Sequence, residues 1–161
     1  MDFEERLQRA IQRGHRRHES SAAEDRAKAL TEEDFKRIHS QMRLELSEYI
    51  EQCLKRLAAH FPGFQVETLY GDRGWGAACN RDDLRVKSGR RSNEFSRFEI
   101  AVRPFSSYHV VDLQAKGTVR NKELLSRRHF ENIADTDAAS FKELIDTWIV
   151  EYAELYAAAN P

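Results

Sequence analysis

Two stretches of the chain repeat apolar residues at the three- and four-residue spacing of an amphipathic helix. In the first, from about residue 31 to 60, the apolar positions are Phe35, Ile38, Met42, Leu46, Tyr49, Ile50, Cys53, Leu54, Leu57 and Phe61. Thr31 and Asp34 resemble a capping box at its start. In the second, from about residue 138 to 159, they are Phe141, Leu144, Ile145, Trp148, Ile149, Tyr152, Leu155 and Tyr156. This spacing predicts two long amphipathic helices.

Between these helices the apolar period changes to two, the period of half-buried strands. The predicted strands are Phe64 to Tyr70, Trp75 to Cys79, Leu84 to Lys87, Phe95 to Phe105 and Tyr108 to Val119, with Arg127 to Ile133 as an additional candidate. A tight turn is expected at Ser106-Ser107, and residues 87–93, which lack apolar side chains, are expected to form a basic loop. Strands flanked by helices, without strand-helix alternation, predict an α+β fold. Its four- or five-stranded antiparallel sheet should be covered on one face by the two helices.

Residues 1–30 have a different pattern and are predicted to be a mobile basic N-terminal arm, or a short helix. Phe3, Leu7 and Ile11 fall on one helical face, with arginines spread around the rest. From residue 14 to 29 the side chains are small or charged and offer little to bury. Residues 31–161 are therefore expected to form a single α+β domain that does not depend on the arm.

Composition agrees with one globular domain. A chain of 161 residues can remove roughly 70% of its unfolded surface from water. No apolar run approaches the roughly 20 residues of a membrane helix, and the N-terminus lacks the pattern of a secretory signal. The two cysteines form neither a disulfide framework nor a C-x-x-C pair. We therefore expect a cytoplasmic protein that binds no membrane and no cofactor.

The charge is polarised although the net charge is only −1. Between Arg81 and Arg128 there are twelve basic and six acidic residues, whereas from His129 onward seven acidic residues accompany a single Lys142. Attraction to an anionic partner must therefore come from a local basic patch.

No stretch carries a catalytic signature, so the first hypothesis is a non-catalytic interaction or adaptor module that binds a protein partner or itself. The arm has the composition of a short docking helix, with apolar anchors surrounded by arginine. Its candidate partner-binding residues are Phe3, Leu7, Ile11, Arg13, Arg16 and Arg17.

A second hypothesis is nucleic-acid binding by a basic sheet edge, because arginines in loops can bind phosphates with two hydrogen bonds. The candidate residues are Arg90, Arg91, Arg97, Arg120, Lys122, Arg127 and Arg128. Phe105 and Tyr108 at adjacent strand ends could stack on bases.

The third hypothesis is a metal-dependent phosphodiesterase or nuclease that uses Glu99, Asp112 and Lys116. In such enzymes acidic side chains on neighbouring strands bind the metal and a lysine assists the attacking water. Gln114 stands where a further carboxylate would be expected. A small-ligand pocket between the sheet and the helices is also compatible with the sequence, since its apolar lining would look like core.

Overall fold

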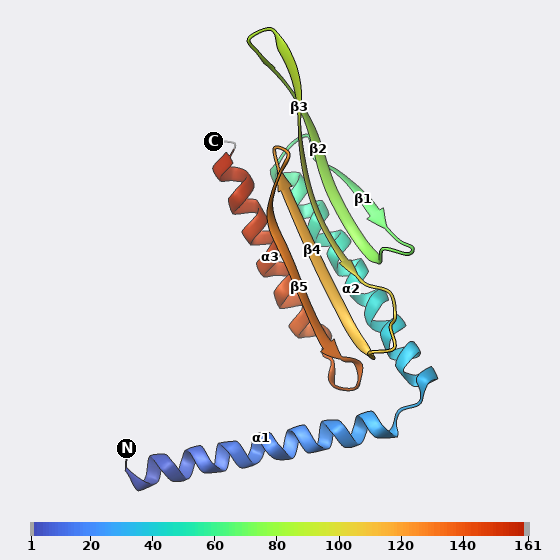
Figure 1. The fold of residues 1–161 in the computed structure, drawn as a ribbon, viewed down its shortest axis with the longest axis vertical. Helices are drawn as coiled ribbons and strands as arrows, with labels where there is room; N and C mark the ends of the chain where they lie inside the picture. Colours follow the sequence, from blue (N-terminus) through green and yellow to red (C-terminus); the bar gives the residue numbers. More distant parts are fainter. Residues whose placement is uncertain (1, 160–161) are drawn as a thin grey trace.

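The computed structural model describes residues 2–159 of the chain, with the side chains of residues 26–29 left aside. The elements, in chain order, are α1 (Phe3–Ala29), α2 (Glu32–His60), β1 (Gln65–Leu69), β2 (Trp75–Lys87), β3 (Arg90–Val102), β4 (Val110–Val119), β5 (Lys122–Asn132), the 3-10 helix η1 (Ile133–Asp135) and α3 (Ala138–Ala159). The strands form one antiparallel sheet in the order β1-β2-β3-β4-β5. Helices α2 and α3 lie across one face of it (Figure 1). This is the α+β fold predicted from the sequence.

Helix α2 begins at the predicted capping box. The Thr31 hydroxyl accepts a hydrogen bond from the Asp34 backbone N–H at 3.2 Å, and the Asp34 carboxylate accepts one from the Thr31 backbone N–H at 3.1 Å. The hydrogen bonds that the Thr31 backbone N–H and hydroxyl donate to the carboxylate lower the pKa of Asp34. The helix ends at His60, before Gly63, whose φ of 104° is in the left-handed region that favours glycine. Its start is thus fixed by its own residues.

Helix α3 closes the core against α2 and the sheet. Its buried side chains are Phe141, Ile145, Trp148, Tyr152 and Tyr156. The ring of Tyr152 stacks on Phe98 of β3 with a centroid separation of 4.5 Å, and its hydroxyl donates to the Thr118 carbonyl at 2.8 Å. Gly117 of β4 lies under this ring, where an added Cβ would be 2.7 Å from the Tyr152 Cδ2 atom. A large aromatic side chain can therefore lie flat on the sheet.

Two hairpins have two-residue turns in which both residues have positive φ. Ser88 and Gly89 join β2 to β3 with φ of 54° and 76°, and Arg120 and Asn121 join β4 to β5 with φ of 48° and 68°. Such turns match the twist of the flanking strands. The Asn121 side chain also accepts from the Phe95 backbone N–H at 2.9 Å, which fastens the second turn to β3.

The strand boundaries differ from the sequence prediction. Residues 87–93 are not a loop, because the Ser88-Gly89 turn lets β2 and β3 stay paired out to Lys87 and Arg90. Trp75–Lys87 is consequently one strand. Ser106-Ser107 is not a tight strand-to-strand turn but part of a longer connection between Val102 and Val110. Strand β5 begins at Lys122, well before the Arg127 expected from the sequence.

Helix α1 occupies most of the segment predicted to be an arm. It extends away from the sheet and the other helices (Figure 1). Every side chain from Phe3 to Ser21 is exposed, and its contacts with the rest of the described chain are concentrated at η1. Leu30, which follows it, packs against the core. Whether the helix moves relative to the domain stays a prediction.

Candidate functional site

Helix α1 presents the predicted partner-binding residues on two adjoining stripes. At about 100° per residue, Phe3, Leu7 and Ile11 fall within an arc of about 100°. The arginines are not spread around the rest of the helix: Arg6, Arg9, Arg13, Arg16 and Arg17 share a second arc of about 100° beside the first. We call these the apolar stripe and the arginine stripe. The anchors Phe3, Leu7 and Ile11 are 74%, 43% and 50% exposed.

The predicted nucleic-acid-binding residues do not form one sheet edge. Arg97 lies on the central strand β3, whereas Arg127 and Arg128 lie on the edge strand β5 and point to opposite faces. Arg127 pairs with Glu151 of α3, and Arg128 pairs with Asp112 of β4. Arg90 and Arg91 lie at the β2–β3 turn, and Arg120 and Lys122 lie at the β4–β5 turn.

Arg90 and Arg91 belong instead to a projecting two-stranded ribbon. Beyond Asn80 and Arg97, residues 81–96 of β2 and β3 pair only with each other among the described strands. Asn121 of the β4–β5 turn bonds to Asn93 and Phe95, and the ribbon projects past this turn (Figure 1). We call this the β2–β3 ribbon. Its exposed tip carries Arg85, Lys87, Arg90 and Arg91, and residues 84–93 contain no acidic side chain. It is the part of the basic region that is free of neighbouring carboxylates, apart from a 3.5 Å pair of Arg85 with Glu94.

The carboxylates and lysine of the phosphodiesterase hypothesis share the sheet face opposite α2 and α3, which we call the open face. Glu99 stands directly across from Lys116 in the β3–β4 register. Asp112 lies four residues from Lys116 along β4, a separation of about 13 Å at about 3.3 Å per residue. Both carboxylate oxygens of Asp112 accept hydrogen bonds from the Arg128 guanidinium, at 3.1 and 2.7 Å. Glu99 and Lys116 therefore meet, but Asp112 is held by a different partner.

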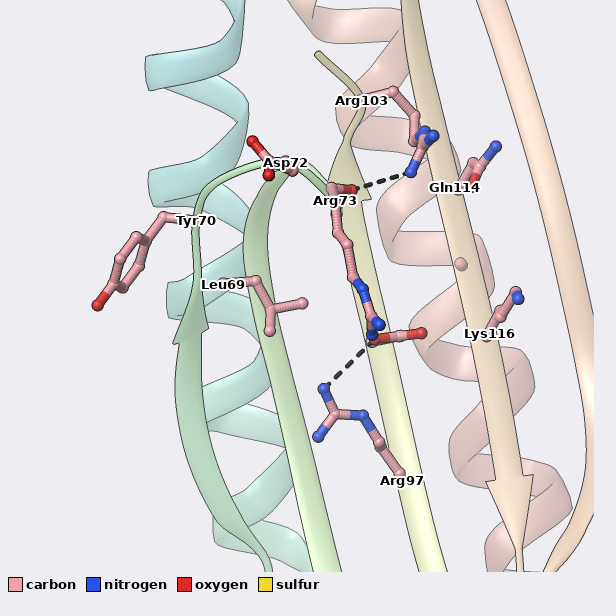
Figure 2. A pocket seen from close by; sticks show the side chains of 12 residues that line it. Leu69, Tyr70, Asp72, Arg73, Arg97, Arg103, Gln114 and Lys116 are labelled. Atoms are coloured by element: carbon pink, nitrogen blue, oxygen red, sulfur yellow. Dashed lines mark hydrogen bonds and ion pairs between the residues drawn. The ribbon is translucent and has the colours of Figure 1, made fainter.

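Glu99 and Lys116 line a hollow of about 440 Å³ on the open face. Figure 2 shows Arg73 of the β1–β2 turn lying along β3, with Gln114 and Lys116 rising from β4 beside it. Arg103, just after β3, donates to the Arg73 carbonyl at 3.1 Å. The hollow thus lies across the sheet from the helices, not between sheet and helices as the sequence allowed.

An ion-pair chain forms one wall of this hollow. The Arg97 guanidinium donates to Glu67 of β1 at 2.6 Å and to Glu99 at 3.3 Å. Elsewhere on the open face, the hydrogen bonds of Arg128 to Asp112 raise the pKa of the Arg128 guanidinium. The carboxylates of the open face are therefore largely engaged by arginine.

The two cysteines have the properties of core residues. Cys79 is fully buried, and burial raises the pKa of its thiol to about 12. Burial also raises the pKa of Cys53. Neither thiol therefore supplies a thiolate near neutral pH.

Within residues 2–159, no three His, Cys, Asp or Glu side chains gather closely enough to hold a metal ion. No helix in that range is long and apolar enough to cross a bilayer.

Sequence reasoning did not single out Arg73 or Arg103, which complete the hollow. Both lie in connections, so strand periodicity says nothing of where they point. The signal for the ribbon was present, because Ser88-Gly89 is a suitable pair for a two-residue hairpin turn.

Comparison of this chain with protein-family models, with curated proteins and with solved structures gave no match.

Proposed function

We propose that this protein is a non-catalytic interaction module whose helix α1 docks into a groove on a partner protein. The observation that carries the proposal is the apolar stripe, exposed on a helix that packs against the rest of the described chain near one end. Helices in water gain most of their stability from packing such a stripe rather than from their own hydrogen bonds. A partner that covers Phe3, Leu7 and Ile11 would supply that packing.

The neighbouring arginine stripe indicates the chemistry of the partner. Residues 6–18 contain five arginines and no acidic residue. A groove for this helix should be apolar along its floor and bordered by carboxylates. Full burial of each anchor side chain would contribute at most about 1.5–3 kcal/mol, while the arginines would set the orientation and rate of binding. A second copy offers one source of carboxylates, since Glu143 and Glu154 are exposed on α3.

The test is capture of partners from lysate of the source cell on the full-length chain, before and after nuclease treatment. Replacing Phe3, Leu7 and Ile11 with serine should abolish capture of a defined protein that resists nuclease. Gln8→Ala with Gln12→Ala, on another side of the same helix, is the matched control and should leave capture intact. If the serine variant captures its partner as well as the native chain, the docking role of α1 is wrong. Sedimentation of the pure protein distinguishes a second copy from another partner.

A second candidate function, nucleic-acid binding, is favoured by the β2–β3 ribbon. The major groove of a duplex admits a two-stranded ribbon, and the tip carries four basic side chains. Binding of a labelled duplex should weaken steeply with salt and fall on Arg90→Gln with Arg91→Gln. Arg127→Gln is the control, because that residue faces α3. Absence of duplex binding at low salt removes this candidate.

A further inference from the structure

The hollow on the open face has an excess of positive charge. Four cationic side chains from separate elements line it: Arg73, Arg97, Arg103 and Lys116. Among the described residues, only two carboxylates, Asp72 and Glu99, line it as well, and Glu67, just outside the lining, pairs with Arg97, so one net positive charge remains. In Figure 2 the Asp72 carboxylate points away from the space between Arg73 and Lys116. The part of the hollow between β3 and β4 is therefore the more cationic part.

Two of these cations are available to a ligand. Among the described residues, neither the Arg73 guanidinium nor the Lys116 ammonium has a hydrogen-bond or ion-pair partner. Arg103 uses one nitrogen on the Arg73 carbonyl, which fixes it at the end of the hollow and leaves other N–H groups of its guanidinium to donate. Arg97, by contrast, is engaged by Glu67 and Glu99. Arg73 and Lys116 thus line the hollow as unpartnered cations, with Arg103 at one end of it.

We propose that this hollow binds a small molecule carrying a phosphate monoester. Near pH 7 such a group carries a charge of about −1.5 to −2, which the unpartnered Arg73 and Lys116 cations would match. A guanidinium donates to two phosphate oxygens at once, and an ammonium can donate to the third. The volume of about 440 Å³ falls in the range of roughly 300–1,000 Å³ that is typical of small-ligand pockets. This site is independent of the docking of α1.

Replacing Glu99 tests whether the hollow prefers an anion or a cation. Glu99 stands opposite Lys116 and holds Arg97, so it repels an anion directly and also occupies a cation that could bind one. Glu99→Gln should therefore tighten phosphate binding. A role of Glu99 in holding a metal or a cationic ligand predicts the reverse.

The experiment is calorimetric titration of the full-length chain with inorganic phosphate, adenosine monophosphate, adenosine and succinate, all at equal ionic strength. Both phosphate probes should bind saturably, and adenosine and succinate should bind much more weakly. Arg73→Gln and Lys116→Gln should each weaken binding about tenfold or more, because each removes a charge-assisted donor. Both side chains are exposed, so the fold should tolerate the changes.

Lys122→Gln is the matched control, since it removes an exposed lysine outside the hollow and should leave the affinity unchanged. The proposal is overturned if phosphate and the monophosphate do not bind, or if the control weakens them as much as Lys116→Gln. Equal binding of succinate overturns the assignment to phosphate, and weaker binding by Glu99→Gln overturns the assignment to an anion.

Discussion

Deleting residues 1–29 should leave the stability of the domain almost unchanged. Of the described side chains of α1, only Ala22 and Ala23 are even half-buried. Full burial of one methylene-sized group contributes about 0.8 kcal/mol, so two half-buried methyl groups contribute less than about 1 kcal/mol. The shortened chain keeps Leu30 against the core and the capping box that starts α2. Helix α2 therefore has no need of α1 to begin.

The assay is urea unfolding followed by tryptophan fluorescence, since Trp75 and Trp148 both lie in the domain. Thr31→Ala in the full chain is the comparison, because loss of an N-cap costs about 1 kcal/mol, with a range of about 0.5–2. We expect this single substitution to lower the free energy of unfolding at least as much as removal of the whole helix. A loss above about 2 kcal/mol on deletion would refute the reasoning and show that α1 is packed on the domain.

Two further predictions concern the core. Gly117→Ala should lower the free energy of unfolding by about 1–3 kcal/mol in the same assay, because the alanine methyl group would enter the space of the Tyr152 ring. An unchanged free energy of unfolding contradicts this packing. His39 is buried, its ring nitrogen lies 3.2 Å from the Arg103 carbonyl oxygen, and burial lowers its pKa. The stability that neutral His39 contributes is therefore present above about pH 6.5. It is lost as the pH falls, and the free energy of unfolding then drops by up to about 1.4 kcal/mol per pH unit. Between pH 7.5 and 5.0, the free energy of unfolding should therefore change less in His39→Gln than in the native chain or in the exposed-site control His15→Gln. An equal change in all three proteins contradicts the prediction.

Both domain helices could be predicted because their signals are local. The spacing of Phe35, Met42 and Leu46 places them on one side of α2, and the Thr31 and Asp34 side chains mark where it starts. Burial of these positions needs only a neighbouring sheet, whatever its register. The fold class followed from the same pattern, because a run of strands between two such helices has few ways to bury its apolar side.

Features that depend on pairing could not be predicted in this way. The length of β2 and β3 is set by the turn at Ser88 and Gly89, not by apolar periodicity, so residues 87–93 of the ribbon were mistaken for a loop. Arg127 and Arg128 are adjacent in sequence, yet strand geometry sends them to opposite faces. The hollow needs Arg73 from a turn beside Lys116 from β4, and that meeting exists only once the sheet is assembled.

Because every strand pairs with its neighbour in sequence, the sheet can assemble one hairpin at a time. Turns of two residues close β2 onto β3 and β4 onto β5, so little chain entropy is lost before pairing begins. The long-range step is the packing of α3 beside α2, which covers the apolar side of the sheet. During synthesis from the N-terminus, that side stays partly bare until the 22 residues of α3 have been made. Chains that end before α3 should therefore be the ones most prone to aggregate.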